Sequence, residues 1–481
     1  MDLGNLSVLK IVKLIKDREI KCVDLCKYYL SRIEEYRDKN AVLEVFDDAI
    51  TRAEYLDKTI DNYDELPSLF GVPILIKDNI FYKGKICSNG SKFMENYVAQ
   101  YDATVITKLL DAGVVILGRT NMDEFAMGGS CENSAYGPCK NAHNDSRVSG
   151  GSSGGSAVAV ALDMCAFALG SDTGGSVRQP AAYNGIVGLK PTYGRISRYG
   201  LCAYASSLDT VGIFTRDVRD NAYVLGVIAG NDISDPTSLN DPVDDYIGNI
   251  DFSIKGKKIA IIKEVQELVS KTPYASIYQN VLSYCQKHGA IVTETSLPEY
   301  ESVLPAYYTL APAEASSNMG RYDSIRFASK DSAESYNDLV VNARSQYLGK
   351  EVKRRIMLGN FVLSSEYYNA YYLKAKAIAK SLKKKILNIL KNNDLIFLPT
   401  AYGEAFEIGS KTSDPVSMYI EDMFTVTANI VGLPALSIPI ANGETGLPLG
   451  LQILGRHLGE SEIYNMADYI LTQGGSTYVR L

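Results

Sequence analysis

The sequence predicts an α/β fold in which a β-sheet is covered by helices on both faces. Three apolar runs, at residues 71–76, 113–117 and 395–399, are short and continuous, which is typical of strands buried on both faces. Stretches with helical periodicity lie between such runs along the chain. The 481 residues are 46% hydrophobic and 22% charged, so there is enough apolar material for a large core.

The first part of the chain is predicted to be helical and then to enter the sheet. Residues 5–36 carry two helical patterns, with Ser7 as a suitable N-cap and the second pattern at 23–36. The strand predicted at 71–76 ends directly before Lys77. A helix is expected at 104–111, immediately before the strand at 113–117.

Residues 146–212 are unusually rich in glycine and serine. Two glycine-rich turns, at 150–155 and 170–176, flank an apolar run of small residues at 157–169. We expect this run to be a helix, because small side chains allow a helix to pack closely inside a core. The two turns are therefore candidates for a catalytic or ligand-binding site.

The second half continues the same alternation. Residues 256–295 are predicted to form a β-α-β unit, and residues 330–395 to form long helices. There is no internal repeat and no linker that separates domains. The individual elements expected here are strands at 258–262, 290–293, 395–399 and 432–439, and helices at 275–287 and 424–429.

Charge and composition exclude several classes of function. The net charge is −7 and the pI about 5.3, so the chain is a poor candidate for the main contact with a phosphate backbone. The eight cysteines and three histidines show no zinc-ligand spacing, and no metal site is expected. No apolar run reaches the roughly 20 residues that span a bilayer, and no signal peptide is visible. A cytoplasmic location without membrane association is therefore the default expectation.

The turn at 150–155 alone admits two conventional interpretations. It fits the glycine spacing of a phosphate-binding loop, but Ser156 stands where the lysine of that loop should follow. It also fits the G-x-S-x-G pattern of a nucleophile elbow, with His457 late enough in the chain to complete a triad. The elbow needs a strand directly before it, and the preceding residues 140–147 are polar.

A third interpretation takes both glycine turns together. Ser176 follows two glycines, so the backbone N–H groups of Thr173, Gly174, Gly175 and Ser176 could form an oxyanion hole. A serine hydroxyl is a weak nucleophile and needs a base. Lys77 could supply it, because burial at the end of an apolar strand would lower its pKa and leave a neutral amine.

These segments resemble the amidase signature family over nearly the whole chain. The resemblance is carried by GVPILIKDN at 71–79, GGSSGGS at 150–156 and DTGGSVRQPAAYNGIVGLKPTYG at 172–194. It implies the amidase-signature fold, with a large mixed central β-sheet covered by helices on both faces. It also implies a Ser-cisSer-Lys site in which Ser176 is the nucleophile, Ser152 the bridging serine after a cis peptide, and Lys77 the base.

The resemblance also implies one domain over residues 1–481. Its parts would be N-terminal helices at about 5–36, a catalytic core at about 70–230, and further α/β and helical segments at about 250–395. Residues 395–481 would complete the core.

Within the family, three segments look like the glutamine-hydrolysing A subunits of glutamyl-tRNA(Gln)/aspartyl-tRNA(Asn) amidotransferases. They lie at 127–138, 193–200 and 351–359. This implies a heterotrimer with B and C subunits, in which ammonia passes to the B subunit. ATP and Mg²⁺ are expected at the B subunit, which would also hold the misacylated tRNA, and no cofactor is expected on this chain.

Glutamine carries an α-carboxylate and an α-ammonium, and its pocket should bind both. By resemblance these contacts fall on Arg355 and Asp422, with Arg354 and Glu421 as the neighbouring alternatives. The sequence departs from the family pattern beside the site, with Ser149 for a proline and Gly129 and Cys131 for a serine and a threonine. Cys131 is expected to be a packed small residue and not a nucleophile.

Two further classes of function stay open on the sequence alone. A stand-alone amidase acting on small or aromatic amides would use the same two serines and lysine without needing Arg355 and Asp422. A non-catalytic scaffold subunit would keep the fold, but such a relative is expected to lose at least one of Lys77, Ser152 and Ser176, which are all present here.

Overall fold

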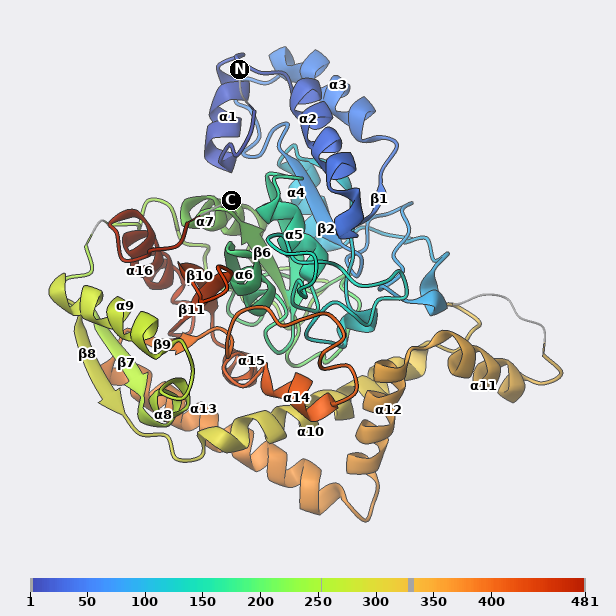
Figure 1. The fold of residues 1–481 in the computed structure, drawn as a ribbon. Coiled ribbons are helices and arrows are strands. Elements are labelled where there is room, and N and C mark those ends of the chain that lie inside the picture. Colours follow the sequence, from blue (N-terminus) through green and yellow to red (C-terminus); the bar gives the residue numbers. More distant parts are fainter. Residues whose placement is uncertain (1–2, 252, 328–332, 480–481) are drawn as a thin grey trace.

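A single mixed β-sheet forms the centre of the molecule (Figure 1). The computed structural model describes residues 3–251, 253–327 and 333–479. In these residues the strand order is β1-β3-β2-β4-β6-β5-β10-β11-β9-β7-β8. The strands are β1 (Val42–Val45), β2 (Pro73–Lys77), β3 (Val115–Thr120), β4 (Phe167–Asp172), β5 (Val187–Lys190), β6 (Thr210–Thr215), β7 (Lys258–Ile262), β8 (Ile291–Thr295), β9 (Leu395–Pro399), β10 (Ala435–Asn442) and β11 (Pro448–Gly455).

The pairing of the strands confirms that the sheet is mixed. The pairs β2–β3, β2–β4, β7–β8 and β7–β9 are parallel, whereas β4–β6, β5–β10 and β10–β11 are antiparallel. Every residue of β2, β3, β4, β5, β6, β9 and β11 is buried. Because successive side chains point to opposite faces of a sheet, both faces are covered.

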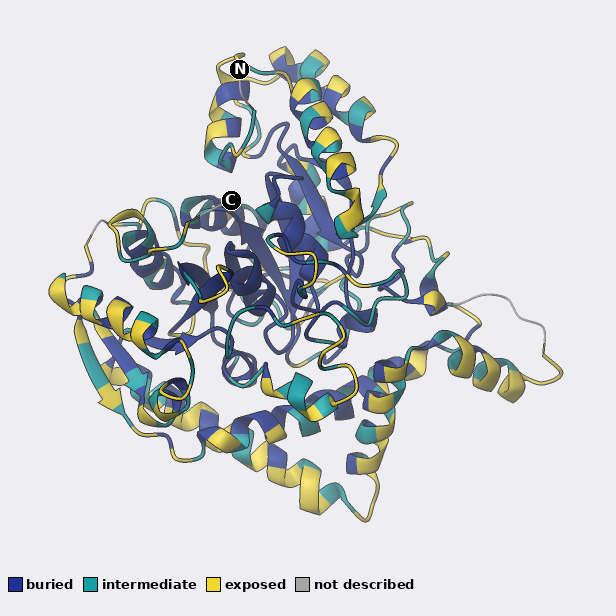
Figure 2. Cartoon of the chain, viewed as in Figure 1, coloured by how far each residue is buried: buried dark blue, intermediate teal, exposed yellow. Residues whose placement is uncertain are grey.

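Helices cover the sheet and extend beyond it. α5 and α6 pack on the central strands, α7 and α16 pack on each other and on the sheet, and α1 to α3 form the N-terminal end. α10, α12 and α13 form a long helical layer whose outer side is exposed (Figure 2). The helices are α1 (Val8–Lys16), α2 (Cys22–Glu35), α3 (Ala49–Thr59), α4 (Thr104–Asp111), α5 (Gly154–Ala161), α6 (Arg178–Asn184), α7 (Val218–Ile228), α8 (Lys263–Val269), α9 (Ala275–Lys287), α10 (Val303–Asn318), α11 (Tyr336–Tyr347), α12 (Lys350–Leu363), α13 (Lys374–Asn392), α14 (Pro415–Ile420), α15 (Val426–Val431) and α16 (Glu460–Thr472).

Most predicted elements are confirmed. Ser7 caps α1 by accepting a hydrogen bond from the Lys10 backbone N–H. The predicted β-α-β unit is present, with β7 and β8 parallel and α9 between them in sequence. The long helices expected at 330–395 are α11, α12 and α13, although residues 330–332 lie outside the described residues.

The single helix expected at 157–169 is wrong in its second half. α5 ends at Ala161, and β4 already begins at Phe167. Asp163 lies between them with a left-handed backbone (φ 56°), which ends the helix. Its buried carboxylate forms an ion pair with Arg216 (2.8 Å) and accepts a hydrogen bond from the Tyr28 hydroxyl. A tertiary contact therefore fixes a turn that the small apolar residues do not reveal.

The topology brings the two predicted catalytic segments together. β2 and β4 are parallel neighbours, so their carboxyl ends lie at the same edge of the sheet. β2 ends at Lys77, and β4 ends at Asp172, directly before the turn that carries Ser176. Among the described residues, the structure contains no helix with the length and apolarity needed to cross a membrane.

Candidate active site

Lys77 is fully buried in a cluster of serine hydroxyls. Its Nζ lies 2.8 Å from Ser152 Oγ, 2.8 Å from Ser153 Oγ and 2.9 Å from Ser171 Oγ. Burial lowers the pKa of Lys77 to about 7, and the more distant carboxylates, Asp123 first, only partly oppose this. A substantial fraction of the neutral amine is therefore present near neutral pH.

The hydrogen bonds around Lys77 favour Ser152 as its proton donor. The Ser153 hydroxyl donates to the Ser171 backbone carbonyl (3.1 Å), so it must accept from Lys77. Ser171 Oγ accepts from Asn79 Nδ2 (2.9 Å) and can accept a second hydrogen bond from Lys77. A neutral amine has two protons and one lone pair, and donation to Ser153 and Ser171 leaves the lone pair for the Ser152 hydroxyl.

The backbone directly before Ser152 is held by the contacts of Gly151. The Gly151–Ser152 peptide is cis, as the family resemblance implies. The Gly151 N–H donates to Gln179 Oε1 (3.0 Å). A Cβ on Gly151 would lie 2.1 Å from Asp123 Oδ2, so only glycine fits there. These contacts hold the Ser152 hydroxyl against Lys77.

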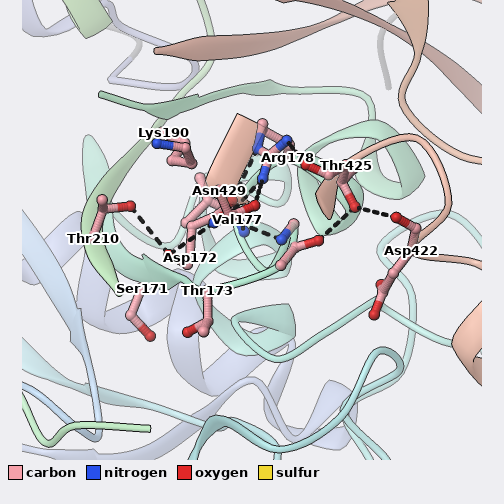
Figure 3. A network of polar contacts seen from close by, with 12 residues as sticks. Ser171, Asp172, Thr173, Val177, Arg178, Lys190, Thr210, Asp422, Thr425 and Asn429 are labelled. Atoms are coloured by element: carbon pink, nitrogen blue, oxygen red, sulfur yellow. Dashed lines mark hydrogen bonds and ion pairs between the residues drawn. The ribbon is translucent and has the colours of Figure 1, made fainter. Parts of the chain in front are cut away.

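The turn before Ser176 is organised by the buried carboxylate of Asp172 (Figure 3). Its two oxygens accept hydrogen bonds from the backbone N–H groups of Gly175 (3.0 Å) and Val177 (3.1 Å). Arg178 forms an ion pair with it at 2.8 Å, and Asn429 Nδ2 donates to it at 2.8 Å. Burial raises the pKa of Asp172, but Arg178 and the hydrogen bonds outweigh it and lower the pKa to about 2.

Ser176 lies at the accessible end of this turn. It is 8% exposed, and its hydroxyl makes no hydrogen bond with any described residue. Of the four predicted oxyanion donors, the N–H of Gly175 is not available to a substrate, because it donates a hydrogen bond to Asp172. The N–H groups of Thr173, Gly174 and Ser176 have no partner among the described groups. These three N–H groups are compatible with contact to a developing oxyanion.

Arg355 is buried in a tyrosine-lined part of the interior. The side chains of Tyr204, Tyr308 and Tyr419 surround its guanidinium, with ring centroids 5.4 to 5.5 Å away. It donates to Glu351 Oε1 (2.8 Å) and to the Tyr204 hydroxyl (2.6 Å). Arg354, by contrast, has a side chain that is 44% exposed, so the geometry favours Arg355 as the internal cation.

Asp422 is half-buried and faces the tyrosine-lined region that contains Arg355. Tyr308 donates its hydroxyl proton to Asp422 Oδ2 (2.6 Å), and burial raises the pKa of Asp422 to about 7. Glu421 points elsewhere, because its carboxylate contacts Lys411 and the Tyr183 hydroxyl. Of the two neighbours, Asp422 is therefore the one that shares a tyrosine contact with Arg355.

A small polar cavity of about 50 Å³ lies at Arg355 and is lined by Gly128, Ser130, Glu351 and Tyr419, among others. Two buried polar atoms close by, Ser130 Oγ and Gln179 Nε2, have no hydrogen-bond partner among the described residues. The sequence did not single out Ser130, Gln179 or Tyr308. For Gln179 the available signal was its position three residues after Ser176.

The other candidates do not form sites. His457 is exposed in the turn after β11, and no strand precedes the turn at 150–155, so the nucleophile elbow is not supported. Burial raises the pKa of the Cys131 thiol well above its usual range, so it is not an activated nucleophile. Ser156, at the lysine position of a phosphate loop, donates to the Leu169 carbonyl (2.9 Å). No three His, Cys, Asp or Glu side chains gather to hold a metal within the described ranges.

Acyl transfer through a serine needs a base and donors for the oxyanion, and the geometry at Lys77 and in the turn before Ser176 is compatible with both. Fold and site together define an amidohydrolase with a Ser-Ser-Lys arrangement. Residues 24–464 match the family model described as Amidase, and the chain belongs to this family.

Relatives match the chain over nearly its full length. It is 48% identical over 477 residues to the glutamyl-tRNA(Gln) amidotransferase A subunit of Thermoanaerobacter pseudethanolicus, covering 97% of this chain and 96% of the relative. It is 46% identical over 488 residues to the corresponding A subunit of Exiguobacterium sibiricum, with both chains covered completely.

Solved structures agree with the fold. The crystal structure of the glutamyl-tRNA(Gln) amidotransferase A subunit from Thermotoga maritima superposes with a TM-score of 0.82 at 35% identity, covering 100% of this chain and 98% of that one. The native peptide amidase from Stenotrophomonas maltophilia superposes with a TM-score of 0.84 at 28% identity, covering 99% of each chain. The predicted amidase-signature fold is therefore confirmed, and the higher identities do not favour a stand-alone amidase.

Proposed function

We propose that this chain is the glutamine-hydrolysing A subunit of a tRNA-dependent amidotransferase. It would release ammonia from glutamine for the conversion of Glu-tRNA(Gln) to Gln-tRNA(Gln), or of Asp-tRNA(Asn) to Asn-tRNA(Asn), or both. The observation that carries the proposal is the combination of a Lys77–Ser152 contact with an Arg355–Asp422 pair connected by Tyr308. A simple amide needs only the first feature, whereas the two charges of free glutamine need the second as well.

In the proposed complex, both charged groups of glutamine are bound at the tyrosine-lined end. The guanidinium of Arg355 meets the α-carboxylate, and Asp422 meets the α-ammonium. Asp422 is connected to the nucleophile turn through Thr425, whose hydroxyl donates to the Gly174 carbonyl (2.6 Å). Holding these two charges fixes the side-chain amide relative to Ser176, which converts attack into an intramolecular step.

The chemistry follows from the proton path. Ser176 Oγ attacks the amide carbon while its proton passes to Ser152 and the Ser152 proton passes to Lys77. The oxyanion is met by the N–H groups of Thr173, Gly174 and Ser176. When the C–N bond breaks, the reversed relay protonates the leaving nitrogen and ammonia departs. Water then attacks the γ-glutamyl ester, Lys77 again accepts a proton through Ser152, and glutamate leaves with Ser176 restored.

The partners follow from the same proposal. B and C subunits would complete a heterotrimer, with ATP, Mg²⁺ and the misacylated tRNA bound at the B subunit. The acidic balance of this chain, −7, supports placing the tRNA contacts elsewhere. A cytoplasmic location is part of this proposal.

The test is ammonia release from L-glutamine by the wild type and by Ser176→Ala, each alone and with candidate B and C subunits. Turnover that rises with the partners and falls by about 10³-fold or more in Ser176→Ala would support the proposal. Hydrolysis of simple amides without any glutamine turnover would move the protein to the stand-alone amidases. Binding to the partners without hydrolysis of any amide would indicate a scaffold role.

A further inference from the structure

Thr425 connects two parts of the site that are more than 240 residues apart in the sequence. Its hydroxyl is buried and donates to the carbonyl of Gly174, in the turn before Ser176, at 2.6 Å. Its backbone N–H donates to the carbonyl of Asp422 at 3.1 Å. The close-up shows Thr425 between Asp422 on one side and the Asp172 turn on the other (Figure 3).

The Gly174–Gly175 peptide is held at both ends. Its carbonyl accepts the Thr425 hydrogen bond, and its N–H donates to Asp172 Oδ1 at 3.0 Å. Gly175 has φ +134°, and a Cβ there would lie 2.3 Å from Thr425 Oγ1, so glycine is required. Glycine does not restrict this peptide sterically, so its orientation depends on these two hydrogen bonds.

The orientation of the Gly174–Gly175 peptide determines which backbone N–H groups face the reacting carbonyl. As it stands, the Gly175 N–H points to Asp172, while the N–H groups of Gly174 and Ser176 have no partner among the described groups. If the peptide rotated, the Gly175 N–H would leave Asp172 and the flanking donors would change direction. The geometry of the oxyanion hole therefore depends on the Thr425 hydroxyl.

Thr425 is itself fixed by the charged network. Arg178 donates to the Thr425 carbonyl at 2.7 Å and to both oxygens of Asp172. Asp172, Arg178, Thr425 and the Gly174–Gly175 peptide thus close a ring of hydrogen bonds. A displacement of the Asp422 backbone reaches this ring through Thr425, because the Thr425 N–H and the Thr425 hydroxyl both lie within hydrogen-bond distance of the Asp422 carbonyl, at 3.1 Å each.

We infer that Thr425 is a positioning residue that couples occupancy of the α-ammonium subsite at Asp422 to the alignment of the oxyanion donors beside Ser176. This inference rests on the proposed glutaminase function, because it needs a substrate with an α-ammonium. Its consequence is discrimination at the chemical step: an amide with an α-ammonium reacts faster, and does not only bind more tightly.

The test compares L-glutamine with 4-carbamoylbutanoate, which is glutamine without its α-amino group. The wild type, Thr425→Val, Thr425→Ser and Thr427→Val are assayed as full chains together with the partner subunits. Thr427 is the matched control, because it is buried in α15 two residues after Thr425 and its hydroxyl has no hydrogen-bond partner among the described residues. The measured quantities are kcat and KM for both substrates, with thermal unfolding to check folding.

For Thr425→Val we expect kcat with glutamine to fall about 10- to 100-fold, with KM changed by less than about threefold. The ratio of kcat for glutamine to kcat for 4-carbamoylbutanoate should fall about tenfold, which a purely structural loss would not produce. Thr425→Ser should restore both values to within about threefold, and Thr427→Val should match the wild type. If Thr425→Val does not fold, Thr425→Ala gives the same comparison.

Equal losses on both substrates, or an unchanged Thr425→Val, would overturn the inference and leave the proposed function intact. A wild type that hydrolyses 4-carbamoylbutanoate or other simple amides but not glutamine would overturn the proposed function, and this inference with it. The two failures are therefore distinguishable in one set of assays.

Discussion

At the scale of single residues, the proposed chemistry depends on Lys77 losing a proton near neutral pH. Its pKa is lowered to about 7 because burial disfavours the charged amine, and among the described residues the hydrogen-bond partners of Nζ are hydroxyls. The base is the neutral form, so its fraction grows as pH rises through the pKa. We expect the rate of acylation to rise about tenfold between pH 6 and 7.5 and to reach a plateau above pH 8. Single-turnover kinetics with butyramide would measure this, because that amide does not involve Asp422.

Lys190 provides the matched control for this prediction. It is equally buried and burial lowers its pKa to about 7, but its Nζ donates to the Pro191 carbonyl (2.8 Å), away from the serine cluster. Lys77→Met should abolish the inflection by reducing acylation about 10²- to 10⁴-fold. Lys190→Met should leave the inflection in the pH profile unchanged. An inflection that disappears with Lys190, or a rate independent of pH, would contradict the assignment of Lys77 as base.

Asp422 gives a second prediction at this scale. Asp422→Asn removes the anion that meets the α-ammonium, so KM for glutamine should rise about 10- to 100-fold. KM for 4-carbamoylbutanoate should change by less than about twofold. Because burial raises the pKa of Asp422 to about 7, KM of the wild type for glutamine should fall as pH rises through 7.

Glu421→Gln is the control for Asp422→Asn, because Glu421 faces Lys411 and Tyr183. Steady-state kinetics of both variants decide between the neighbours. A larger effect at Glu421 would reverse the assignment of the ammonium subsite.

Sequence reasoning singled out candidate residues that sit in distinctive local patterns, such as Lys77 at the end of an apolar strand and Ser176 after two glycines. It did not single out Ser171, because nothing in its local sequence separates it from an ordinary polar residue. Ser171 reaches Lys77 across 94 residues, through the pairing of β2 with β4. Such convergence depends on strand order, which periodicity does not encode.

At the scale of elements, the junction of β4 and α6 combines the proposed catalytic turn with a buried ion pair. Asp172 and Arg178 are both 0% exposed and pair at 2.8 Å. Asp172→Asn leaves the guanidinium buried without its counter-charge, which should destabilise the protein by about 3–5 kcal/mol at pH 7. Urea unfolding of the wild type and the variant would measure the difference.

The pH dependence of that difference follows from the depressed pKa. The folded pKa of Asp172 is about 2, below the unfolded value near 3.9, so its contribution is fully present above about pH 4. This contribution to stability is lost as pH falls from about 4 through 2. The difference between wild type and Asp172→Asn should therefore be constant from pH 7 to about 4.5 and should shrink below that. A decline already between pH 7 and 5 would contradict the depressed pKa of Asp172.

The elements themselves show where sequence patterns are sufficient. Amphipathic or strand-like segments such as α4, α9, β7 and β9 have the predicted bounds, because their periodicity or length identifies them. The stretch 157–169 does not, because a run of small apolar residues is compatible with a helix and with a buried strand. The ion pair of Asp163 with Arg216 decides between the two, and it is invisible to local reasoning.

At the scale of the whole molecule, segments that are distant in the sequence form the buried core together, through strand pairing and hydrogen bonds. β5 pairs with β6 on one side and with β10 on the other. Buried Arg178 directs hydrogen bonds to the Thr425 carbonyl, to Asn429 and to Gln452. These contacts support the proposal that the chain is one domain, since the catalytic core at about 70–230 cannot satisfy its own buried groups.

The last prediction concerns division of the chain between α7 and β7, into residues 1–249 and 250–481. The first fragment contains Lys77, Ser152 and Ser176, but it leaves the β5 edge unpaired and the Arg178 guanidinium without three of its partners. Leaving a buried charge short of hydrogen bonds is among the costliest changes a core can undergo.

Fragment 1–249 alone should therefore show no cooperative urea transition and no amide hydrolysis, whereas co-expression of both fragments should restore hydrolysis. Circular dichroism and ammonia release would measure the two properties. A cooperative transition in fragment 1–249 alone would instead divide the chain into two domains and place the core of the fold in its first half.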